Sequence, residues 1–327
     1  MVKIMINNNE LKIKNEYDRE FSNIINYCKD NSLDNIFMNI IKIVNNMKIQ
    51  NIQNYNTFVQ YFSKYPLWGS LNPDLGDFTT LRLRAEVLKN HIDDFIWLYE
   101  KLEDYLSKRT LIAILANWAF MDTKYLRIVK SIFRDYWEPD LFPNNKDDVL
   151  VDVGAYVGDS ILSYVSMYGT DYKKIYAYEI TPDSCFQLKN NVNKYSLHDV
   201  IIRQKGAGSK NSKMFLSGNS IDTSANRINK FGGQEVEIVR LDDDLDDIPT
   251  FIKMDIEGAE KDALLGLEGI IKEYAPKLAI CTYHGYDDIW MIPKMIYEMN
   301  SNYKFYMRHN GGDLIPTEFV LLCKPIK

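Results

Sequence analysis

Three side chains that could act on a hydroxyl group follow two apolar segments in the second half of the chain. Asp255 and Glu257 come after the apolar segment Thr250–Met254, and His284 follows Lys277–Tyr283. Two carboxylates could order a substrate hydroxyl, accept its proton or hold a divalent cation. A neutral imidazole is a suitable general base. We therefore predict that Asp255, Glu257 and His284 are catalytic, and the sequence leaves open whether they hold a metal ion.

Each of these residues also has a structural interpretation. Acidic side chains stabilise the start of a helix, so Glu257 and Glu260 could simply cap the helix that follows them. His284 could be a structural histidine that bonds to the backbone. His309, which lies in the predicted final hairpin, is a further candidate for contact with the substrate. These alternatives stay open until the residues are placed in space.

A glycine turn earlier in the chain predicts a nucleotide-binding corner. The apolar segment Val149–Val153 leads into Gly154 and Gly158, and a helical pattern follows. Glycines leave room for a ligand, and the free N–H groups of a new helix point into the gap. A strand, a glycine turn and a helix form the nucleotide-binding corner of doubly wound α/β folds. The cofactor-binding residues that we predict here are Asp152, Gly154, Ala155, Tyr156, Gly158, Asp159 and Ser160.

The details of this turn favour one class of ligand. Ala155 stands where the dinucleotide fingerprint has its second glycine, which leaves less room for a pyrophosphate. Asp152 and Asp159 are expected to add negative charge, which suits a ligand with a cationic group. Glu179, 25 residues after Gly154, can accept hydrogen bonds from both hydroxyls of a ribose. We therefore expect S-adenosyl-L-methionine as the cofactor.

Four more positions complete the predicted cofactor site. They follow the strands that come next along the chain, and they are Ile180, Gly206, Ala207 and again Asp255. An NAD-dependent oxidoreductase is the competing enzyme class. The short-chain type would need Tyr-x-x-x-Lys, and none of the 22 tyrosines has a lysine four residues later.

The elements that must position these residues divide the chain into two parts. Only two of the 16 glycines precede residue 150. We predict a helical N-terminal domain over residues 1–145, with helical patterns at Leu33–Ile49 and Leu83–Leu106. Residues 146–327 alternate strand and helix, which predicts an α/β fold with a doubly wound, mostly parallel sheet and a C-terminal β-hairpin. The predicted strands are Val149–Val153, Lys174–Ile180, Val200–Gln204, Thr250–Met254, Lys277–Tyr283, Tyr303–Arg308 and Glu318–Cys323, with extra strands at Met214–Leu216 and Val236–Leu241; the predicted helices are Ser160–Tyr168, Pro182–Tyr195, Ala259–Tyr274 and Ile289–Met299.

Composition excludes several classes of protein. The chain has 327 residues, 46% of them hydrophobic and 26% charged, which is ordinary for a globular protein. Its net charge of −6 offers no footprint for general nucleic-acid binding. We expect no membrane span, because no stretch of about 18 residues is continuously apolar. Four scattered cysteines without a Cys-x-x-Cys pair indicate a reducing, cytoplasmic setting.

Taken together, these segments resemble the FkbM-like family of S-adenosylmethionine-dependent methyltransferases. The resemblance covers roughly residues 140–325, and its most specific part is the Ile-Lys-x-Asp-x-Glu-Gly-Ala-Glu string. At Ile180 the sequence departs from the pattern that many members of the family have, and this departure does not change the role expected for Glu179. The matching segments are 151–160, 177–182, 252–260, 283–284 and 303–309.

The resemblance implies a seven-stranded class I methyltransferase fold and methyl transfer to oxygen. The expected acceptor is a small molecule or a glycan: a sugar hydroxyl, as in polysaccharide biosynthesis, or a secondary metabolite. It also implies that His284 is the base and that Asp255 and Glu257 order the acceptor. The N-terminal domain could act as a substrate lid or form a homodimer. A different class also remains open, namely a cofactor-binding interaction protein with a helical partner module and little catalysis.

Overall fold

The computed structural model describes residues 13–133, 136–216, 228–229 and 234–326. Their contacts form two compact units. The first holds the described residues up to Glu100 together with Asp104–Val129 and Asp313–Ile315. The second holds Lys101–Glu103, Lys130–Gly312 and the described residues from Pro316 onward.

The first unit is built from helices. The described helices are α1 (Glu16–Asp30), α2 (Leu33–Gln50), α3 (Ile52–Lys64), α4 (Thr79–Asn90), α5 (Ile92–Lys101, whose last residue is assigned to the second unit), α6 (Tyr105–Phe120) and α7 (Lys124–Ile128), with short 3-10 turns at Pro66–Trp68 and Pro73–Leu75. Helix α6 is buried at most of its positions, and α1, α2, α4 and α7 pack against it. The predicted helix over Leu33–Ile49 is confirmed as α2. The single helix predicted for Leu83–Leu106 is wrong, because the chain breaks at His91 between α4 and α5.

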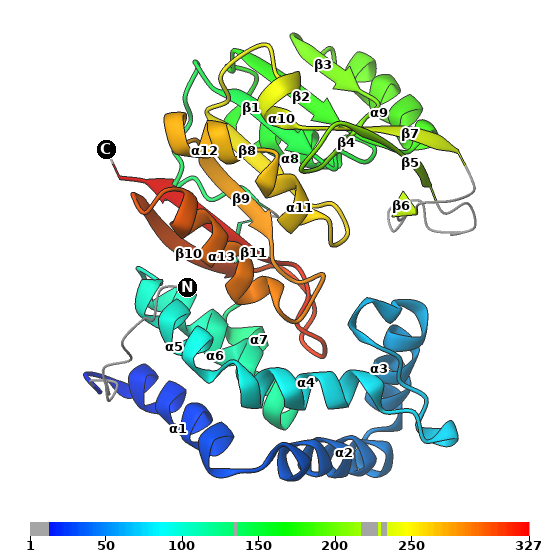
Figure 1. Cartoon of the computed structure of the whole chain (residues 1–327), viewed down its shortest axis with the longest axis vertical. Helices are drawn as coiled ribbons and strands as arrows, with labels where there is room; N and C mark the ends of the chain where they lie inside the picture. The colour runs from blue at the N-terminus through cyan, green and yellow to red at the C-terminus, as the bar shows by residue number, and fades with distance from the viewer. Residues whose placement is uncertain (1–12, 134–135, 217–227, 230–233, 327) are drawn as a thin grey trace. The chain divides into compact units, whose positions relative to one another are not determined.

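The second unit contains the predicted sheet (Figure 1). Its seven strands lie in the order β10-β11-β9-β8-β1-β2-β3. Strand β11 runs antiparallel to both of its neighbours, and the other neighbouring strands of this sheet are parallel to each other. The mostly parallel sheet and its C-terminal hairpin are therefore confirmed. The strands are β1 (Val149–Val153), β2 (Lys174–Tyr178), β3 (Val200–Arg203), β8 (Phe251–Met254), β9 (Lys277–Cys281), β10 (Tyr303–His309) and β11 (Phe319–Pro325).

Helices connect the parallel strands on both sides of β1. Strand β1 is buried along its whole length, as a strand covered on both faces should be. From β1 to β3 the chain moves across the sheet in one direction, and from β8 to β9 it moves in the opposite direction. Because both sets of crossovers are right-handed, their helices cover opposite faces of the sheet. The connecting helices are α8 (Asp159–Tyr168) and α9 (Pro182–Lys194) on the β2–β3 side, and α11 (Glu260–Leu265), α12 (Glu268–Tyr274) and α13 (Asp288–Met299) on the β8–β9 side.

The single helix predicted for Ala259–Tyr274 is in fact two. Helix α11 ends before Gly266, and α12 begins at Glu268. A Cβ atom at Gly266 would lie 2.1 Å from the main-chain oxygen of Gly208. The break therefore coincides with a close approach of two backbones, which only the folded arrangement reveals.

A small second sheet accompanies the large one. It has the order β4-β7-β5-β6, and α10 (Leu241–Asp244) follows its strand β7. The sequence predicted two of these strands but not that they form a separate sheet. Most of the residues between the two predicted extra strands, Met214–Leu216 and Val236–Leu241, lie outside the described residues. The strands are β4 (Gly206–Ala207), β5 (Ser212–Leu216), β6 (Ile228–Asn229) and β7 (Glu235–Val239).

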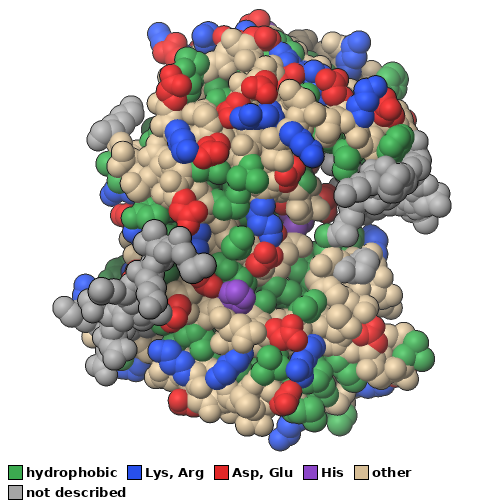
Figure 2. Space-filling view, in the orientation of Figure 1, with side chains coloured by type: hydrophobic (Ala, Val, Ile, Leu, Met, Phe, Trp, Pro, Cys, Tyr) green, Lys and Arg blue, Asp and Glu red, His purple; other side chains and the backbone are tan. Residues whose placement is uncertain are grey.

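The surface carries charges of both signs. On the face in Figure 2, the lysine and arginine side chains of the described residues are interspersed with aspartate and glutamate side chains.

All four cysteines are buried and free. Among the helices in the described ranges, none has the length and apolar character needed to cross a membrane.

Candidate active site

The glycine turn after β1 brings the ends of three strands together. Gly154 has a φ of 81° and Gly158 a φ of 86°, a conformation that favours glycine. The N–H groups of Gly154 and Ala155 both donate to the oxygen of Tyr178, at the end of β2, at 2.9 Å. On the other side, a Cβ atom at Gly154 would lie 1.9 Å from the main-chain oxygen of Asp255, which follows β8. The turn therefore fits only as a close junction of β1, β2 and β8.

Glu179 is held in place by the same corner. Its Oε2 accepts a hydrogen bond from the N–H of Tyr156 at 2.9 Å, and its Oε1 accepts one from the N–H of Thr181 at 2.7 Å. Tyr156 reaches this position with a left-handed φ of 47°. Each carboxylate oxygen can accept a second hydrogen bond. Glu179 is therefore oriented before any ligand arrives and keeps acceptor capacity for hydroxyl groups.

Asp152 faces the interior of the unit. Its Oδ1 lies 2.9 Å from the Nζ of Lys253, and both side chains are nearly or fully buried. Lys253 also donates to the main-chain oxygen of Gly154 at 2.7 Å, and the Ser160 hydroxyl donates to Asp152. The charge of Asp152 is thus balanced internally, and the pair braces the glycine turn. Asp159, in the first turn of α8, is the exposed acid of this corner.

The residues predicted beyond β2 also come together. A Cβ atom at Gly206 would lie 3.0 Å from Cδ1 of Ile180 and 2.7 Å from Cδ1 of Ile238. Gly206 and Ala207 form the short strand β4, which pairs with β7. Ile180 and Gly206 therefore adjoin at the side of the corner where β2 ends.

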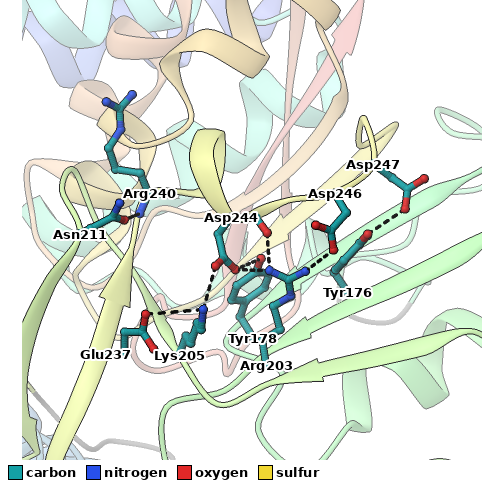
Figure 3. Close-up of polar contacts among 10 residues, drawn as sticks. All are labelled: Tyr176, Tyr178, Arg203, Lys205, Asn211, Glu237, Arg240, Asp244, Asp246 and Asp247. Atoms are coloured by element: carbon teal, nitrogen blue, oxygen red, sulfur yellow. Dashed lines mark hydrogen bonds and ion pairs between the residues drawn. The ribbon is translucent and has the colours of Figure 1, made fainter.

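A network of charges fastens this side of the corner (Figure 3). Asp244, at the end of α10, lies 2.6 Å from Nη1 of Arg203 and 2.8 Å from Nζ of Lys205, and it accepts a hydrogen bond from the Tyr178 hydroxyl at 2.8 Å. Burial alone would raise the pKa of Asp244, but hydrogen bonds and cations hold this pKa below its ordinary value. The network ties the ends of β2 and β3 to α10. The acidic run that supplies Asp244 carried no recognised signal in the sequence.

The predicted catalytic residues form one cluster. Nε2 of His284 lies 3.3 Å from Oδ1 of Asp255 and 3.8 Å from Oε2 of Glu257. One ligand atom from each of the three residues lies within 4.8 Å of the others. Because Asp255 is also the residue that approaches Gly154, the cluster lies beside the glycine turn.

Two further residues complete the cluster, and their roles were predicted only in part. Oε1 of Glu260 lies 2.9 Å from Nδ1 of His284 and accepts a hydrogen bond from the N–H of Ile256 at 2.8 Å. Glu260 thus caps the start of the helix, which was the structural role considered for it, and it also contacts His284. Tyr136, whose hydroxyl donates to Oδ2 of Asp255 at 2.6 Å, lies 119 residues away in the chain and had no local signal.

The carboxylates decide the charge of the histidine. Burial would lower the pKa of His284, but Glu260, Asp255 and Glu257 raise it to about 10. Burial, with the nearby carboxylates, raises the pKa of Glu257 to about 7. Burial also opposes the charge of Asp255, yet His284 and Lys253 hold its pKa below the ordinary value. These carboxylates therefore favour the charged form of the His284 ring when no cation is bound, whereas the sequence predicted a neutral ring.

His309, the further candidate for contact with the substrate, is fully buried at the end of β10.

Comparison with known proteins agrees with this architecture. Residues 152–310 match the model of the methyltransferase FkbM domain. The structure is similar to that of methyltransferase FkbM from Methylobacillus flagellatus KT, with a TM-score of 0.64 and 24% sequence identity over 82% of this chain and 70% of that chain. At this identity the likeness shows the fold.

Two other solved structures are less similar. The first is an rRNA methylase from Streptococcus thermophilus, with a TM-score of 0.38 and 12% identity over 56% of this chain and 90% of that chain. The second is precorrin-6y C5,15-methyltransferase from Geobacter metallireducens GS-15, with a TM-score of 0.36 and 11% identity over 56% of this chain and 81% of that chain. Similarity this low supports no statement about substrate or ligand. Among curated proteins, no sequence matches the chain.

The family model spans the glycine turn, Glu179 and the cluster residues Asp255, Glu257, Glu260 and His284, but not Tyr136. The resemblance seen in the sequence is thereby confirmed. Residues 152–310 of this chain, just under half of its length, match the methyltransferase FkbM domain.

Proposed function

We propose that the chain is an S-adenosyl-L-methionine-dependent O-methyltransferase that acts on a hydroxyl group. One observation carries the proposal: the backbone of Gly154 approaches Asp255 so closely that a Cβ atom would lie 1.9 Å from its oxygen. Because of this contact, the glycine turn with Glu179, which suits a ribose, lies beside the cluster that begins at Asp255, which suits a hydroxyl group. Methyl transfer requires the donor and the acceptor to be aligned, and the two groups of residues meet that requirement.

The cofactor would be held by the glycine corner. Glu179 fits a ribose, because its carboxylate is oriented by two N–H groups and retains two acceptor positions. The bound cofactor supplies a methyl group on a positively charged sulfur. The residues assigned to its binding are Asp152, Gly154, Ala155, Tyr156, Gly158, Asp159, Ser160, Glu179, Ile180, Gly206, Ala207 and Asp255; Asp152 and Ser160 act from the interior by bracing the turn.

The acceptor would be held by Asp255, Glu257 and His284. A new bond forms between the acceptor oxygen and the methyl carbon, the bond from that carbon to sulfur breaks, and the hydroxyl loses its proton. Carboxylates accept hydrogen bonds from hydroxyl groups, so the cluster can hold the acceptor and take up this proton. We propose a sugar hydroxyl of a glycan or a secondary metabolite as the acceptor, and the cytoplasm as the setting. The helical N-terminal part would serve as a substrate lid or a homodimer surface.

The proposal is tested with the full chain in two steps. Calorimetry measures the binding of S-adenosylmethionine and of S-adenosylhomocysteine. Transfer of an isotope-labelled methyl group is then measured with a panel of sugars, glycans and phenolic metabolites. The proposal predicts that both compounds bind and that at least one hydroxyl acceptor is methylated. Binding without transfer to any acceptor would favour the interaction-protein alternative, and an absence of binding would overturn the proposal.

A further inference from the structure

We infer that Asp255, Glu257 and His284 form a binding site for one divalent cation, with Glu260 as a positioning residue for the histidine. The atoms that face one another in this cluster are Oδ1 of Asp255, Oε2 of Glu257 and Nε2 of His284. The inference concerns the same site as the proposed function and names what occupies it. Cation binding can be measured without the methyl donor or an acceptor, so it can stand or fall separately from methyl transfer.

The spacing of the ligand atoms suits a common cation. Two ligands at about 2.1 Å from one ion lie about 3.0 Å apart at a right angle and about 3.4 Å apart at a tetrahedral angle. Nε2 of His284 lies 3.3 Å from Oδ1 of Asp255 and 3.8 Å from Oε2 of Glu257. The first distance already fits, and a small rotation of the partly exposed Glu257 side chain would bring the second into range.

The cluster also contains buried polar atoms that lack hydrogen bonds. Both ring nitrogens of His284 and Oδ1 of Asp255 form no hydrogen bond among the described residues, although carboxylate oxygens lie near each nitrogen and the His284 side chain is only 1% exposed. Buried polar atoms are rarely left in this state, and a bound ion is one of the standard reasons. Nε2 faces the carboxylates of Asp255 and Glu257, which is an arrangement that a cation would complete.

A carboxylate stands behind the histidine on the side away from the proposed cation. Oε1 of Glu260 lies 2.9 Å from Nδ1 of His284 and is itself held by the N–H of Ile256. Histidines that bind metals usually donate their other N–H group to a carboxylate, which fixes the ring and its tautomer. The buried Lys253 contacts Asp152 and the main-chain oxygen of Gly154 rather than the carboxylates of this cluster. A bound cation would offset the negative charge of Asp255, Glu257 and Glu260.

The exposure of the three ligands shows where the site opens. The side chains of Asp255 and Glu257 are 18% and 29% exposed, whereas His284 is 1% exposed. Three protein ligands leave about three positions of a six-coordinate ion free. These positions would face the open side, where two neighbouring acceptor oxygens could bind. Two carboxylates with one imidazole suit a first-row divalent ion such as Mn²⁺, because carboxylate favours Mg²⁺ and Mn²⁺ while imidazole favours the transition metals.

The test titrates the chelator-treated full chain with Mn²⁺ and follows the signal of free Mn²⁺ by electron paramagnetic resonance. One ion per chain is expected to bind, and pulsed measurements should detect one directly coordinated nitrogen. Asp255→Asn, Glu257→Gln and His284→Gln should each weaken binding by tenfold or more, and only His284→Gln should remove the nitrogen coupling. Glu260→Gln should weaken binding about 10- to 100-fold while keeping the nitrogen coupling.

Glu268→Gln is the matched control, because Glu268 is a half-exposed acid on α12 paired with Lys272. It should leave Mn²⁺ binding unchanged. Circular dichroism checks the folding of every variant, and the nitrogen coupling of the wild-type chain decides the matter even if one variant fails to fold. Binding that occurs without nitrogen coupling, or that Glu268→Gln weakens as much as the cluster variants do, would overturn the inference. So would an absence of binding at millimolar Mn²⁺. Intact S-adenosylmethionine binding with no Mn²⁺ binding would refute the cation site and leave the proposed function standing.

Discussion

The main-chain oxygen of Asp255 lies where a side chain at Gly154 would begin. The two positions are 101 residues apart in the chain, and an added Cβ atom would approach that oxygen to 1.9 Å. Gly154 closes the corner after β1, and Asp255 begins the acid cluster after β8. The contact therefore fixes the separation of the two halves of the proposed active site.

Gly154→Ala should destabilise the second unit. The substitution forces a left-handed φ on alanine, which costs about 1–3 kcal/mol, and the clash with Asp255 adds about 1–3 kcal/mol or more. Gly169→Ala is the control, because Gly169 has a φ of 82° and no atom within 4 Å of an added Cβ. Urea unfolding monitored by circular dichroism measures both. Equal losses in the two variants would show that the contact with Asp255 is unimportant.

Lys253→Met should lower the unfolding free energy more than a substitution that leaves no charge unpaired in the interior. It leaves Asp152 buried without its ion-pair partner, a change that typically costs about 3–5 kcal/mol. The double variant Asp152→Asn with Lys253→Met removes the unpaired charge and should recover part of the loss. A double-mutant cycle of unfolding free energies checks this. If the two losses simply add, the buried pair does not brace the turn.

Asp244 should contribute to stability in a pH-dependent way. Its pKa in the folded protein is lowered, so its contribution is complete above the unfolded value of about 3.9 and is lost as the pH falls through the folded value. The unfolding free energy of the wild type should therefore exceed that of Asp244→Asn by a constant amount between about pH 5 and pH 7. The excess should shrink below about pH 4.

The control for this prediction is Asp246→Asn. Asp246 also pairs with Arg203, but its side chain is 74% exposed, so its removal should change stability little. Urea unfolding at a series of pH values measures both variants. An Asp244→Asn difference that stays constant down to pH 3 would contradict the role given to the network in Figure 3.

Local patterns predicted the parts of the site that depend on local geometry. The glycine turn and the position of Glu179 follow from strand and turn signals, and the meeting of Asp255 with His284 follows from the shared edge of parallel strands. The start of α1 also carries a local signal, because the Asn15 side chain accepts a hydrogen bond from the N–H of Asp18, yet neither α1 nor α3 was predicted individually.

Other features depend on tertiary contacts that no local pattern encodes. Tyr136 reaches Asp255 from 119 residues away, and the break at Gly266 reflects the nearby backbone of Gly208. The interior position of Asp152 follows from its pairing with Lys253 on the neighbouring strand. The raised pKa of His284 reflects three carboxylates acting together, and from the sequence Glu260 was recognised only as a residue at a helix start.

The most direct test of the central claim is a calorimetric titration of S-adenosylmethionine into the wild-type chain and into Glu179→Gln. A hydrogen bond to a charged group is worth about 1.5–3 kcal/mol, so losing the carboxylate should weaken binding roughly 10- to 100-fold. The account predicts binding of one molecule per wild-type chain and this loss in the variant, with the unfolding free energy of the variant measured alongside. Equal affinity of the two folded proteins, or no binding to the wild type, would contradict it.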